Sequence, residues 1–380
     1  MFRLNKYISP DLLKEAEEVL IHLAAGVIYQ EEKLKQHTYK PVTELEPSLQ
    51  RAWDRLTLFC YTQEADPPKH FPELIEWLHC PVEKWEGVGD IFKELQLSGS
   101  ILFYGSPTEL CIELGKDYVG SSDLEREIQD RPMKEILKYC YDNYLVDEYS
   151  KARRFLVENP FLTRGIPEIL DYYNWDSKIQ SLLIQCYQPI PPICLRYDKQ
   201  QKYIALCPRC GWALEWKNNQ YAQCYSDLCG RIINIHDATF LECPQEAMRT
   251  IRGIQYSTVG PEKPLLNLYN LLTEKLKLNV ELWPEIDLFD LYIEFPDGEF
   301  WAVDMKDIFN PRNLARIENR KEKSFSTVLL WEKAFFVFPT YRRKPGYLEV
   351  FKQTWKGQEN CDAIFVDDFI KQVKERLKHA

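Results

Sequence analysis

The stretch Trp283–Asp307, WPEIDLFDLYIEFPDGEFWAVDMKD, decides the fold of the C-terminal part of this 380-residue chain. Two runs rich in aromatic and β-branched residues, 288–295 and 299–306, flank the tripeptide Pro296-Asp297-Gly298. Proline and glycine at these positions are a strong turn signal, and runs of this composition are typical of strands. The stretch therefore predicts a β-hairpin.

The hairpin places three polar side chains on one face. If the tripeptide forms the loop, Phe295 faces Glu299, and the same register sets Asp290 directly opposite Asp304. Like charges so placed destabilise a hairpin unless something neutralises them, and a divalent cation does so most readily. Lys306 lies two residues beyond Asp304 and therefore points to the same side. Two carboxylates and a lysine around a hard cation indicate a phosphodiester-cleaving centre.

The elements around the hairpin follow a regular order. Leucines at helical spacing predict a helix over 263–277, and NVELW at 279–283 predicts a short strand. After the hairpin, Asn310-Pro311 supplies an N-cap and a proline at N1 for a helix to about Lys323. The run AFFVF at 334–338 predicts a buried strand. The expected order is helix, three strands, helix and strand.

This arrangement resembles the PD-(D/E)xK superfamily, the fold of many restriction endonucleases. The resemblance implies that Asp290 and Asp304 hold Mg²⁺ or Mn²⁺, helped by the carbonyl of Met305. It also implies that Lys306 positions the attacking water or stabilises charge on the phosphate. Glu274 is expected to orient a water, as a helix glutamate does in some relatives, or else to be an exposed helix carboxylate.

The sequence departs from that pattern in two places. The Pro-Asp dipeptide of the superfamily is Phe289-Asp290 here, and Asp304 stands where glutamate is commoner. Asp287 is the rival first ligand if the register slips. The tripeptide acid-x-Lys has little weight alone, because Asp176-x-Lys178 also has it. An ordinary solvated hairpin face is the alternative interpretation.

Four cysteines form a second motif. Cys207 and Cys210 are separated by two residues, and thirteen residues later come Cys224 and Cys229. This spacing predicts a zinc ribbon in which four thiolates give Zn²⁺ a closed, structural shell. A disulfide pair is the weaker alternative, and His236 is a possible substitute ligand that is more often a surface residue.

Composition limits the class of protein and its expected location. Hydrophobic residues at 45% and aromatics at 13% are typical of a globular protein. No apolar run approaches the ~20 residues that a membrane-spanning helix needs, so no membrane partner is expected. The N-terminus lacks a secretory pattern, and scattered cysteines suit a reducing compartment, so we expect a cytoplasmic protein.

The charge distribution leaves room for nucleic acid. The formal net charge is -10, but residues 250–380 contain equal numbers of basic and acidic residues, so the excess acid precedes them. Two basic groups, on the helix after Lys306 and beyond the 334–338 strand, are candidates for phosphate contacts. They are Arg312, Arg316, Arg320, Arg342 and Arg343. Solvated charged surfaces are the alternative.

The sequence indicates a multidomain α plus α/β protein. We expect a helical domain over 1–190, a zinc ribbon over 195–245 and a restriction-endonuclease-like mixed sheet flanked by helices over 250–380. The first helix begins after Ser9-Pro10 and is expected to stop at Gly26. Prolines at 261 and 264 are expected to mark the boundary before the restriction-endonuclease-like core.

The whole layout resembles the restriction-endonuclease-related protein of bacterial pPIWI-RE three-gene islands. The carrying motifs are YQPIPP, CPRCGWAL, LWPEIDLFDL and FWAVDMKDIFNPRNLA. The resemblance implies an Argonaute-like pPIWI-RE protein and a DinG-type helicase as partners, and defence against invading DNA or RNA:DNA hybrids. Two functions stay open: a Mg²⁺-dependent endonuclease acting on nucleic acid, DNA rather than RNA, or a weakly cutting or non-cutting assembly subunit.

Overall fold

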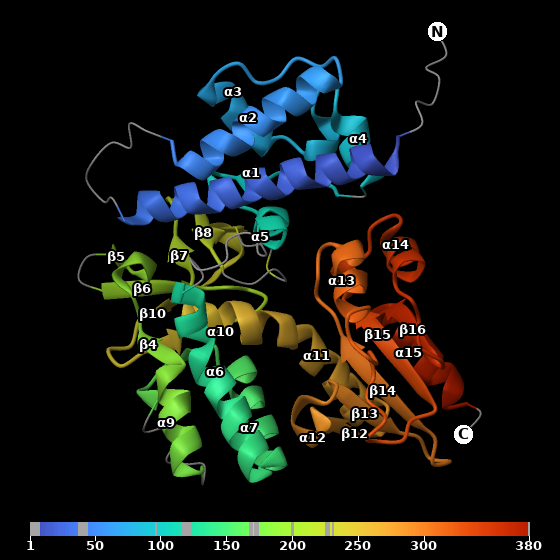
Figure 1. Ribbon diagram of the computed structural model, residues 1–380. Coiled ribbons are helices and arrows are strands. Elements are labelled where there is room, and N and C mark those ends of the chain that lie inside the picture. The colour runs from blue at the N-terminus through green and yellow to red at the C-terminus, as the bar shows by residue number, and fades with distance from the viewer. Residues whose placement is uncertain are drawn as a thin grey trace. The chain divides into compact units, whose positions relative to one another are not determined.

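The structure is a computed structural model of the whole chain (Figure 1). It describes residues 8–36, 45–95, 97–115, 124–166, 170, 175–198, 201–224, 229 and 232–378. The chain divides by compactness into two units, Met1–Leu124 and Glu125–Ala380. This division by compactness does not test whether the three predicted ranges fold independently. The three domains therefore stay a prediction.

The first unit is mainly helical. Its elements are α1 (Pro10–Gln36), α2 (Pro47–Thr62), α3 (Phe71–His79), α4 (Gly89–Glu94), α5 (Glu109–Gly115) and the small hairpin β1 (Leu102–Phe103) and β2 (Ser106–Pro107). Helix α2 packs along α1, and Leu20, Leu23, Leu49 and Leu56 are buried. Each of these two helices therefore buries an apolar face.

The predicted stop at Gly26 is wrong, because α1 continues to Gln36. A Cβ at Gly26 would lie 2.6 Å from the Cα of Leu49. The glycine therefore permits the close approach of α2 to α1, and the packing gained there offsets the helix propensity that glycine lacks.

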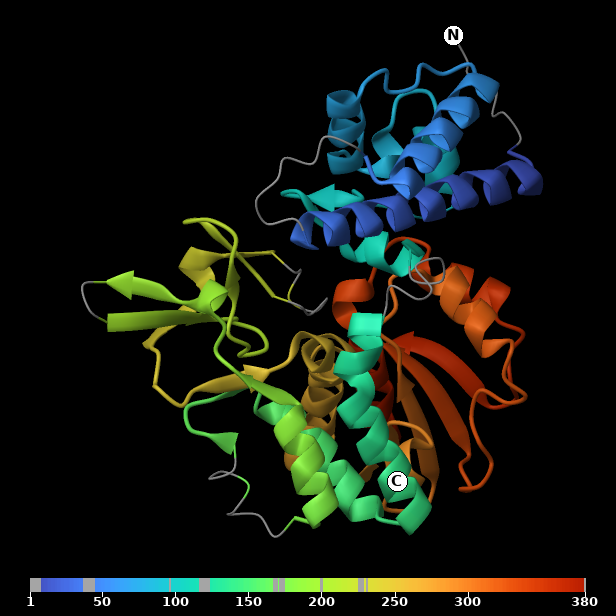
Figure 2. The same cartoon turned by 60° about the vertical axis from the view of Figure 1, so that its left-hand side comes forward.

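The second unit begins with helices and two small groups of strands. Helices α6 (Leu124–Asn143), α7 (Val146–Glu158) and α9 (Ser177–Gln185) lie side by side in Figures 1 and 2. Strands β3 (Phe161–Leu162) and β4 (Tyr187–Pro189) pair with β11 (Met248–Thr250). Two further three-stranded sheets comprise β5 (Arg196–Asp198), β6 (Gln201–Leu206) and β10 (Thr239–Glu242), and β7 (Glu215–Trp216), β8 (Tyr221–Gln223) and β9 (Ile232–Asn234).

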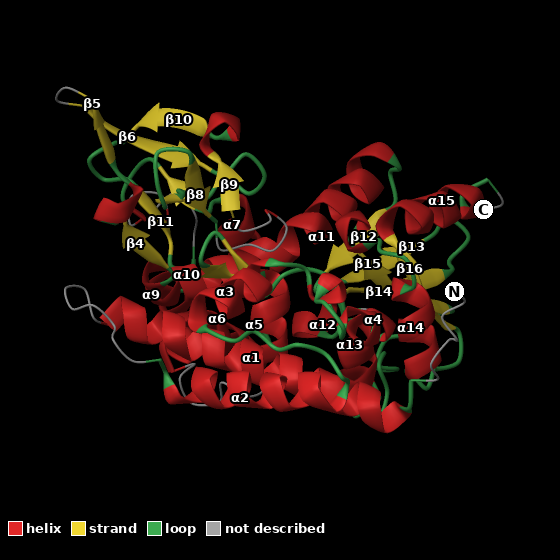
Figure 3. Cartoon of the chain, turned by 90° about the horizontal axis from the view of Figure 1, so that it is seen from above, coloured by secondary structure: helices red, strands yellow, loops and turns green. Residues whose placement is uncertain are grey.

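A continuous helical run then crosses the unit. It consists of α10 (Arg252–Ile254), the π-helix η6 (Gln255–Val259), α11 (Gly260–Asn270) and the π-helix η7 (Leu271–Lys275). Pro261 and Pro264 lie inside this run instead of at a boundary, directly after the π-helical turn η6. In Figures 1 and 3 the small sheets lie at one end of the run and the large sheet at the other.

The large sheet is mixed, in the order β12-β13-β14-β15-β16. Its strands are β12 (Asn279–Leu282), β13 (Leu291–Glu294), β14 (Phe300–Met305), β15 (Lys333–Phe338) and β16 (Cys361–Phe365). The first three strands are antiparallel and the last three are parallel. An N-terminal helical region and a C-terminal mixed sheet are thus as expected.

Helices cover both faces of this sheet. Residues of α7, α11 and α15 (Val366–Arg376) share a core with Leu291, Val303 and Phe335. On the other face, α13 (Pro311–Glu318) and α14 (Tyr347–Thr354) pack over Ala302 and Phe336. Side chains alternate between the two faces along each strand, which explains the nearly continuous apolar sequence of β15. The result is a three-layer α/β/α arrangement.

The predicted hairpin register is confirmed. Leu291 pairs with Val303 and Glu294 with Phe300. The Phe295 N–H donates to the Glu299 carbonyl over 2.9 Å, and Gly298, at φ +86°, closes the three-residue loop. The short strand β12 also forms where NVELW predicted it. This register determines which polar side chains meet.

Candidate active site and four-cysteine cluster

A cavity of about 300 Å³ opens where β13 begins and β14 ends. Its wall contains the four carboxylates of Glu262, Asp287, Asp290 and Asp304, and it also contains Arg153, Lys306 and Lys321. The structure therefore brings together Asp290, Asp304 and Lys306, the three residues that the sequence placed on one face.

Asp290 is the most buried of the predicted acids, at 9% exposure. Its N–H donates to the Val303 carbonyl over 2.9 Å, and its Oδ2 accepts the Met305 N–H over 2.6 Å. Burial and then the neighbouring carboxylates, Asp304 first, raise the pKa of Asp290 well above its ordinary value. Four carboxylates thus line the cavity beside three cations, and the charged form of Asp290 is disfavoured there.

Lys306 lies between two carboxylates. Its Nζ is 2.7 Å from Asp304 Oδ2 and 3.9 Å from Glu318 Oε1. Burial would lower the pKa of Lys306, but the carboxylates of Asp304, Asp290 and Glu318 outweigh it and raise that pKa. The ammonium group thus stays protonated at physiological pH, which excludes Lys306 as a general base in this state.

Glu318, on α13, is a buried acid that the sequence analysis did not single out. It is 2% exposed, and its Oε1 also lies 2.8 Å from Lys321 Nζ. Its carboxylate therefore binds the ammonium groups of Lys306 and Lys321, which both line the cavity. An acid on the apolar face of a helix, one turn after Leu314, was the available signal.

Glu262 is the helix carboxylate that the sequence analysis missed. It is 7% exposed, lines the cavity from the first turn of α11, and binds the guanidinium of Arg153. Glu274, which the sequence favoured, lies in η7, is exposed and is not in the cavity wall. An acid three residues before the buried Leu265 was the signal for Glu262, but the predicted helix began one residue too late.

The predicted phosphate contacts divide into two groups. Arg312 is half-buried, and Arg316 and Arg320 are exposed, although α13 ends at Glu318 and so leaves Arg320 in the following turn. The expected helix to Lys323 is therefore too long.

Arg342 and Arg343 bind acids of the same chain. Arg342 is 2% exposed, with Nε 2.5 Å from Asp307 Oδ1, which argues against a direct phosphate contact. Arg343 is exposed but lies 2.7 Å from Asp367 and 2.6 Å from Asp368. The ends of the parallel strands bring these acids close, which the sequence did not reveal.

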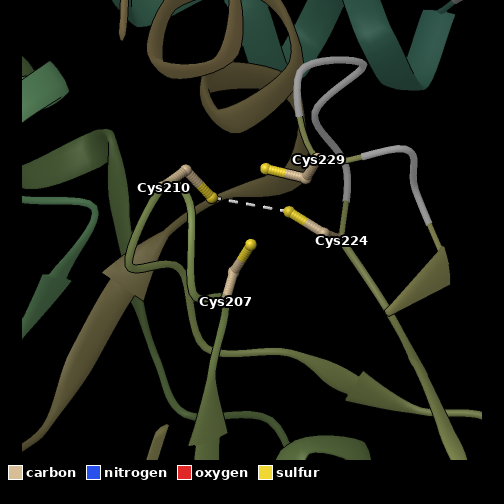
Figure 4. Close-up of side chains that lie close together, drawn as sticks. All are labelled: Cys207, Cys210, Cys224 and Cys229. Carbon is tan, nitrogen blue, oxygen red and sulfur yellow. Dashed lines mark hydrogen bonds between the residues drawn. The ribbon is translucent and has the colours of Figure 1, made fainter. Parts of the chain in front are cut away.

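The four predicted cysteines converge at one point (Figure 4). All four are buried, and their Sγ atoms lie within 4.8 Å of one another. Tetrahedral Zn²⁺ with bonds of ~2.3 Å holds its sulfurs about 3.8 Å apart. A metal ion such as zinc therefore fits the cluster.

The backbone around the first two cysteines has the tight turn that a metal knuckle requires. Gly211 takes φ +80°, its N–H donates to the Cys207 carbonyl over 2.9 Å, and the Cys207 N–H donates to the Trp212 carbonyl over the same distance. Cys224 directly follows β8. His236 is exposed and does not belong to the cluster.

The cluster is anchored to the helical run by buried polar contacts. Arg249 donates to the Ala213 carbonyl over 2.8 Å and to Glu215 over 2.6 Å, and its guanidinium stacks on Trp212 at 4.0 Å. Gln255 donates to Cys210 Sγ over 3.3 Å. A hydrogen bond to a ligand atom of this kind orients a thiolate toward a metal.

Two family descriptions match the chain. Residues 263–380 match "REase associating with pPIWI_RE", and residues 19–163 match "pPIWI_RE three-gene island domain Y". The chain is related to the restriction-endonuclease-related protein of the pPIWI-RE three-gene island. The expected resemblance is thereby confirmed. Searches of curated proteins and of solved structures find no match.

The two matched ranges contain different residues of the candidate sites. The REase match begins at Lys263, so it includes Asp290, Asp304 and Lys306 but not Glu262. Arg153 falls in the domain Y match. The four cysteines lie between the two matched ranges. Among the described residues, no helix is both long and apolar enough to cross a membrane.

Proposed function

We propose that this chain is a divalent-cation-dependent endonuclease that hydrolyses phosphodiester bonds of nucleic acid, DNA rather than RNA. The observation that carries the proposal is that Asp290, Asp304 and Lys306 line the same cavity. The match to a restriction-endonuclease description supports the same reaction class. The island context supports a role in bacterial defence beside a pPIWI-RE protein and a helicase.

Asp290 and Asp304, with the carbonyl of Met305, would hold Mg²⁺ or Mn²⁺. The raised pKa of Asp290 supports this assignment, because burial and the nearby Asp304 disfavour its charged form and a bound cation would stabilise that form. Mg²⁺ suits a site with two carboxylates, since it keeps several positions for water and phosphate oxygens. The chemistry that such an ion supplies when bound is Lewis-acid polarisation of the phosphoryl group.

Lys306 would stabilise the charge that grows on the scissile phosphate. Its raised pKa keeps it protonated, and Asp304 and Glu318 fix its ammonium group from two sides. A fixed cation at developing negative charge lowers the barrier without reorganisation. The two expected roles, positioning the attacking water and stabilising the charge, are both open to a protonated Lys306, and its fixed ammonium group supports charge stabilisation.

Phosphates beside the cut would contact Lys321 in the cavity wall and the exposed arginines of the α13 region, Arg316 and Arg320. These contacts are independent of base sequence, so they would orient the backbone without selecting a site. Arg342 would instead tie the end of β14 to the segment after β15 through Asp307.

The four cysteines would bind Zn²⁺ in a structural site. Four sulfur ligands close the coordination shell and leave no position for a substrate. The buried setting of the cluster and the hydrogen bond from Gln255 to Cys210 support this assignment. The metal would stiffen the small sheets at the start of the helical run.

The second candidate is an assembly subunit that cuts weakly or not at all without its partners. The internal pairing of Arg342 with Asp307 and of Arg343 with Asp367 and Asp368 favours it, because these cations are not presented to a nucleic acid. Cleavage decides between the two candidates.

The test is cleavage of plasmid and single-stranded DNA with Mg²⁺ or Mn²⁺. The wild type is compared with Asp304→Asn and Lys306→Met. Lys178→Met is the matched control, because Lys178 belongs to the acid-x-Lys tripeptide at the exposed start of α9. We expect cutting by the wild type and the control and a loss of at least about a hundredfold in the site variants. Equal cutting by all four proteins would indicate contamination, and no cutting by any would favour the assembly subunit.

A further inference from the structure

Arg153 is a cation that reaches the cavity from outside the nuclease-like core. It lies on α7, its side chain is 13% exposed, and it is in the cavity wall. Its guanidinium bridges two carboxylates: it binds Glu262, and its Nη1 lies 2.5 Å from Asp287 Oδ1. One arginine therefore engages both acids of the wall that lie outside the opposed Asp290 and Asp304 pair.

The guanidinium is fixed in this position by further contacts. It donates to the hydroxyl of Tyr149 over 2.8 Å and lies over the ring of Trp283, 4.7 Å from its centroid. Trp283 opens the loop between β12 and β13 and takes a positive φ of +50°. The arginine is thus built into the site instead of resting on its surface.

The loop that carries Asp287 is strained. Besides Trp283, the non-glycine residues Glu285, Ile286 and Asp287 have φ values of +50°, +60° and +73°. L-residues rarely adopt this left-handed conformation, and it persists only where surrounding contacts enforce it. The ion pair from Arg153 to Asp287 is one contact that enforces it. The loop consequently keeps a carboxylate at the cavity wall.

Four carboxylates around one cavity are enough for two divalent cations. Hydrolytic sites with two metals place them about 4 Å apart between shared carboxylates. Here Asp290 and Asp304 form one pair, and Glu262 and Asp287 form the other. Arg153 forms ion pairs with both acids of the second pair, and the planar donors of a guanidinium group match carboxylate oxygens well.

We propose that Arg153 is a built-in counter-ion that takes the place of a second divalent cation, so that the cavity admits one cation at Asp290 and Asp304. The inference rests on the proposed function. It assigns to α7, which lies outside the segment matched as a restriction endonuclease, a direct part in determining the metal content of the site. Arg153 acts through Glu262 and Asp287 and is therefore a positioning residue.

The test measures Mn²⁺ binding to the full-length protein by calorimetry at pH 8. It compares the wild type with Arg153→Met, which removes the charge, and Arg153→Lys, which keeps it. Arg154→Met is the matched control, because Arg154 is the adjacent residue of α7 and pairs with Glu158 on the same helix. Thermal melting verifies that each variant is folded.

We expect the wild type, Arg153→Lys and Arg154→Met to bind one Mn²⁺ with affinities within about threefold of one another. Arg153→Met should bind a second Mn²⁺, or bind the first about tenfold more tightly, because one positive charge has left the wall. Adding Glu262→Gln to Arg153→Met should reverse that gain.

The outcomes separate this inference from the proposed function. A wild type that binds no Mn²⁺ would overturn both. A wild type that binds one Mn²⁺, with a folded Arg153→Met variant that binds one no more tightly, would overturn the counter-ion alone. Weaker binding by both Arg153 variants would show that the residue only supports the loop, which also overturns it.

Discussion

Replacing Asp290 by asparagine should stabilise the metal-free protein at pH 8. The change keeps the size of the side chain, and the carboxamide oxygen can still accept the Met305 N–H that Asp290 binds over 2.6 Å. It removes one of two like charges in the wall of the same cavity. The repulsion between these two groups is therefore lost.

The magnitude follows from two carboxylates that share one cavity wall. Two unit charges about 5 Å apart repel by about 1–3 kcal/mol at effective dielectric constants between about 20 and 60. In a unit of this size, 1 kcal/mol corresponds to about 2–4 °C in Tm. We expect the Tm of Asp290→Asn in EDTA at pH 8 to exceed that of the wild type by roughly 2–12 °C.

The effect should depend on pH with a definite sign. Burial and Asp304 raise the pKa of Asp290 in the folded state. The folded wild type therefore retains a proton in the range where the unfolded chain loses it, and this stability disappears as pH rises through the raised pKa. The difference between variant and wild type should be small near pH 5 and should grow toward pH 8.

The assay is thermal melting from pH 5 to pH 8, in EDTA and with Mg²⁺. Asp142→Asn, at an exposed position of α6, is the control for loss of one charge in the same unit. Mg²⁺ should stabilise the wild type and the control but not Asp290→Asn, because the variant lacks a ligand. The reasoning is refuted if the variant melts below the wild type in EDTA, or if their difference does not change with pH.

Three other predictions concern the remainder of the second unit. Protein purified without chelator should contain about one zinc per chain, and Cys224→Ser should lower both zinc content and Tm, as measured by elemental analysis and melting. Glu215→Gln should destabilise the unit by about 3–5 kcal/mol in denaturant unfolding, because it leaves the 1%-exposed Arg249 without its charge partner; an unchanged midpoint would contradict this. A fragment of residues 125–380 should be soluble and give dispersed amide spectra, whereas 250–380 should aggregate, because α7 and α9 share a core with the large sheet.

The sequence predicted the hairpin because its rules are local. A loop of Pro296-Asp297-Gly298 specifies the register, which extends to the pair Leu291 and Val303 and brings the adjacent Asp290 and Asp304 to one cavity. The spacing of four cysteines likewise predicted a cluster that the structure assembles. In both cases the residues that meet are close in the chain or belong to a recurrent motif.

The parts that the sequence could not reveal depend on distant contacts. Arg153 meets Glu262 and Asp287 across 109 and 134 residues, and no periodicity connects these positions. Arg342 has the sequence of a surface arginine, but the adjacent ends of parallel strands β14 and β15 place it on Asp307. Glu262 was missed because the predicted helix began at residue 263, and helix phase alone does not say which end of a helix faces a cavity.

The helical run from Arg252 to Lys275 contacts both the four-cysteine cluster and the acidic cavity. Gln255 touches the thiol cluster and Glu262 touches the acidic cavity, only seven residues farther along. Seven residues of helix span about 10 Å, so the thiols and the carboxylate end lie within a few turns of the same run. Oxidation of the thiols or removal of their metal would act close to the carboxylate end, so the redox history of a preparation belongs among the controls of any activity measurement.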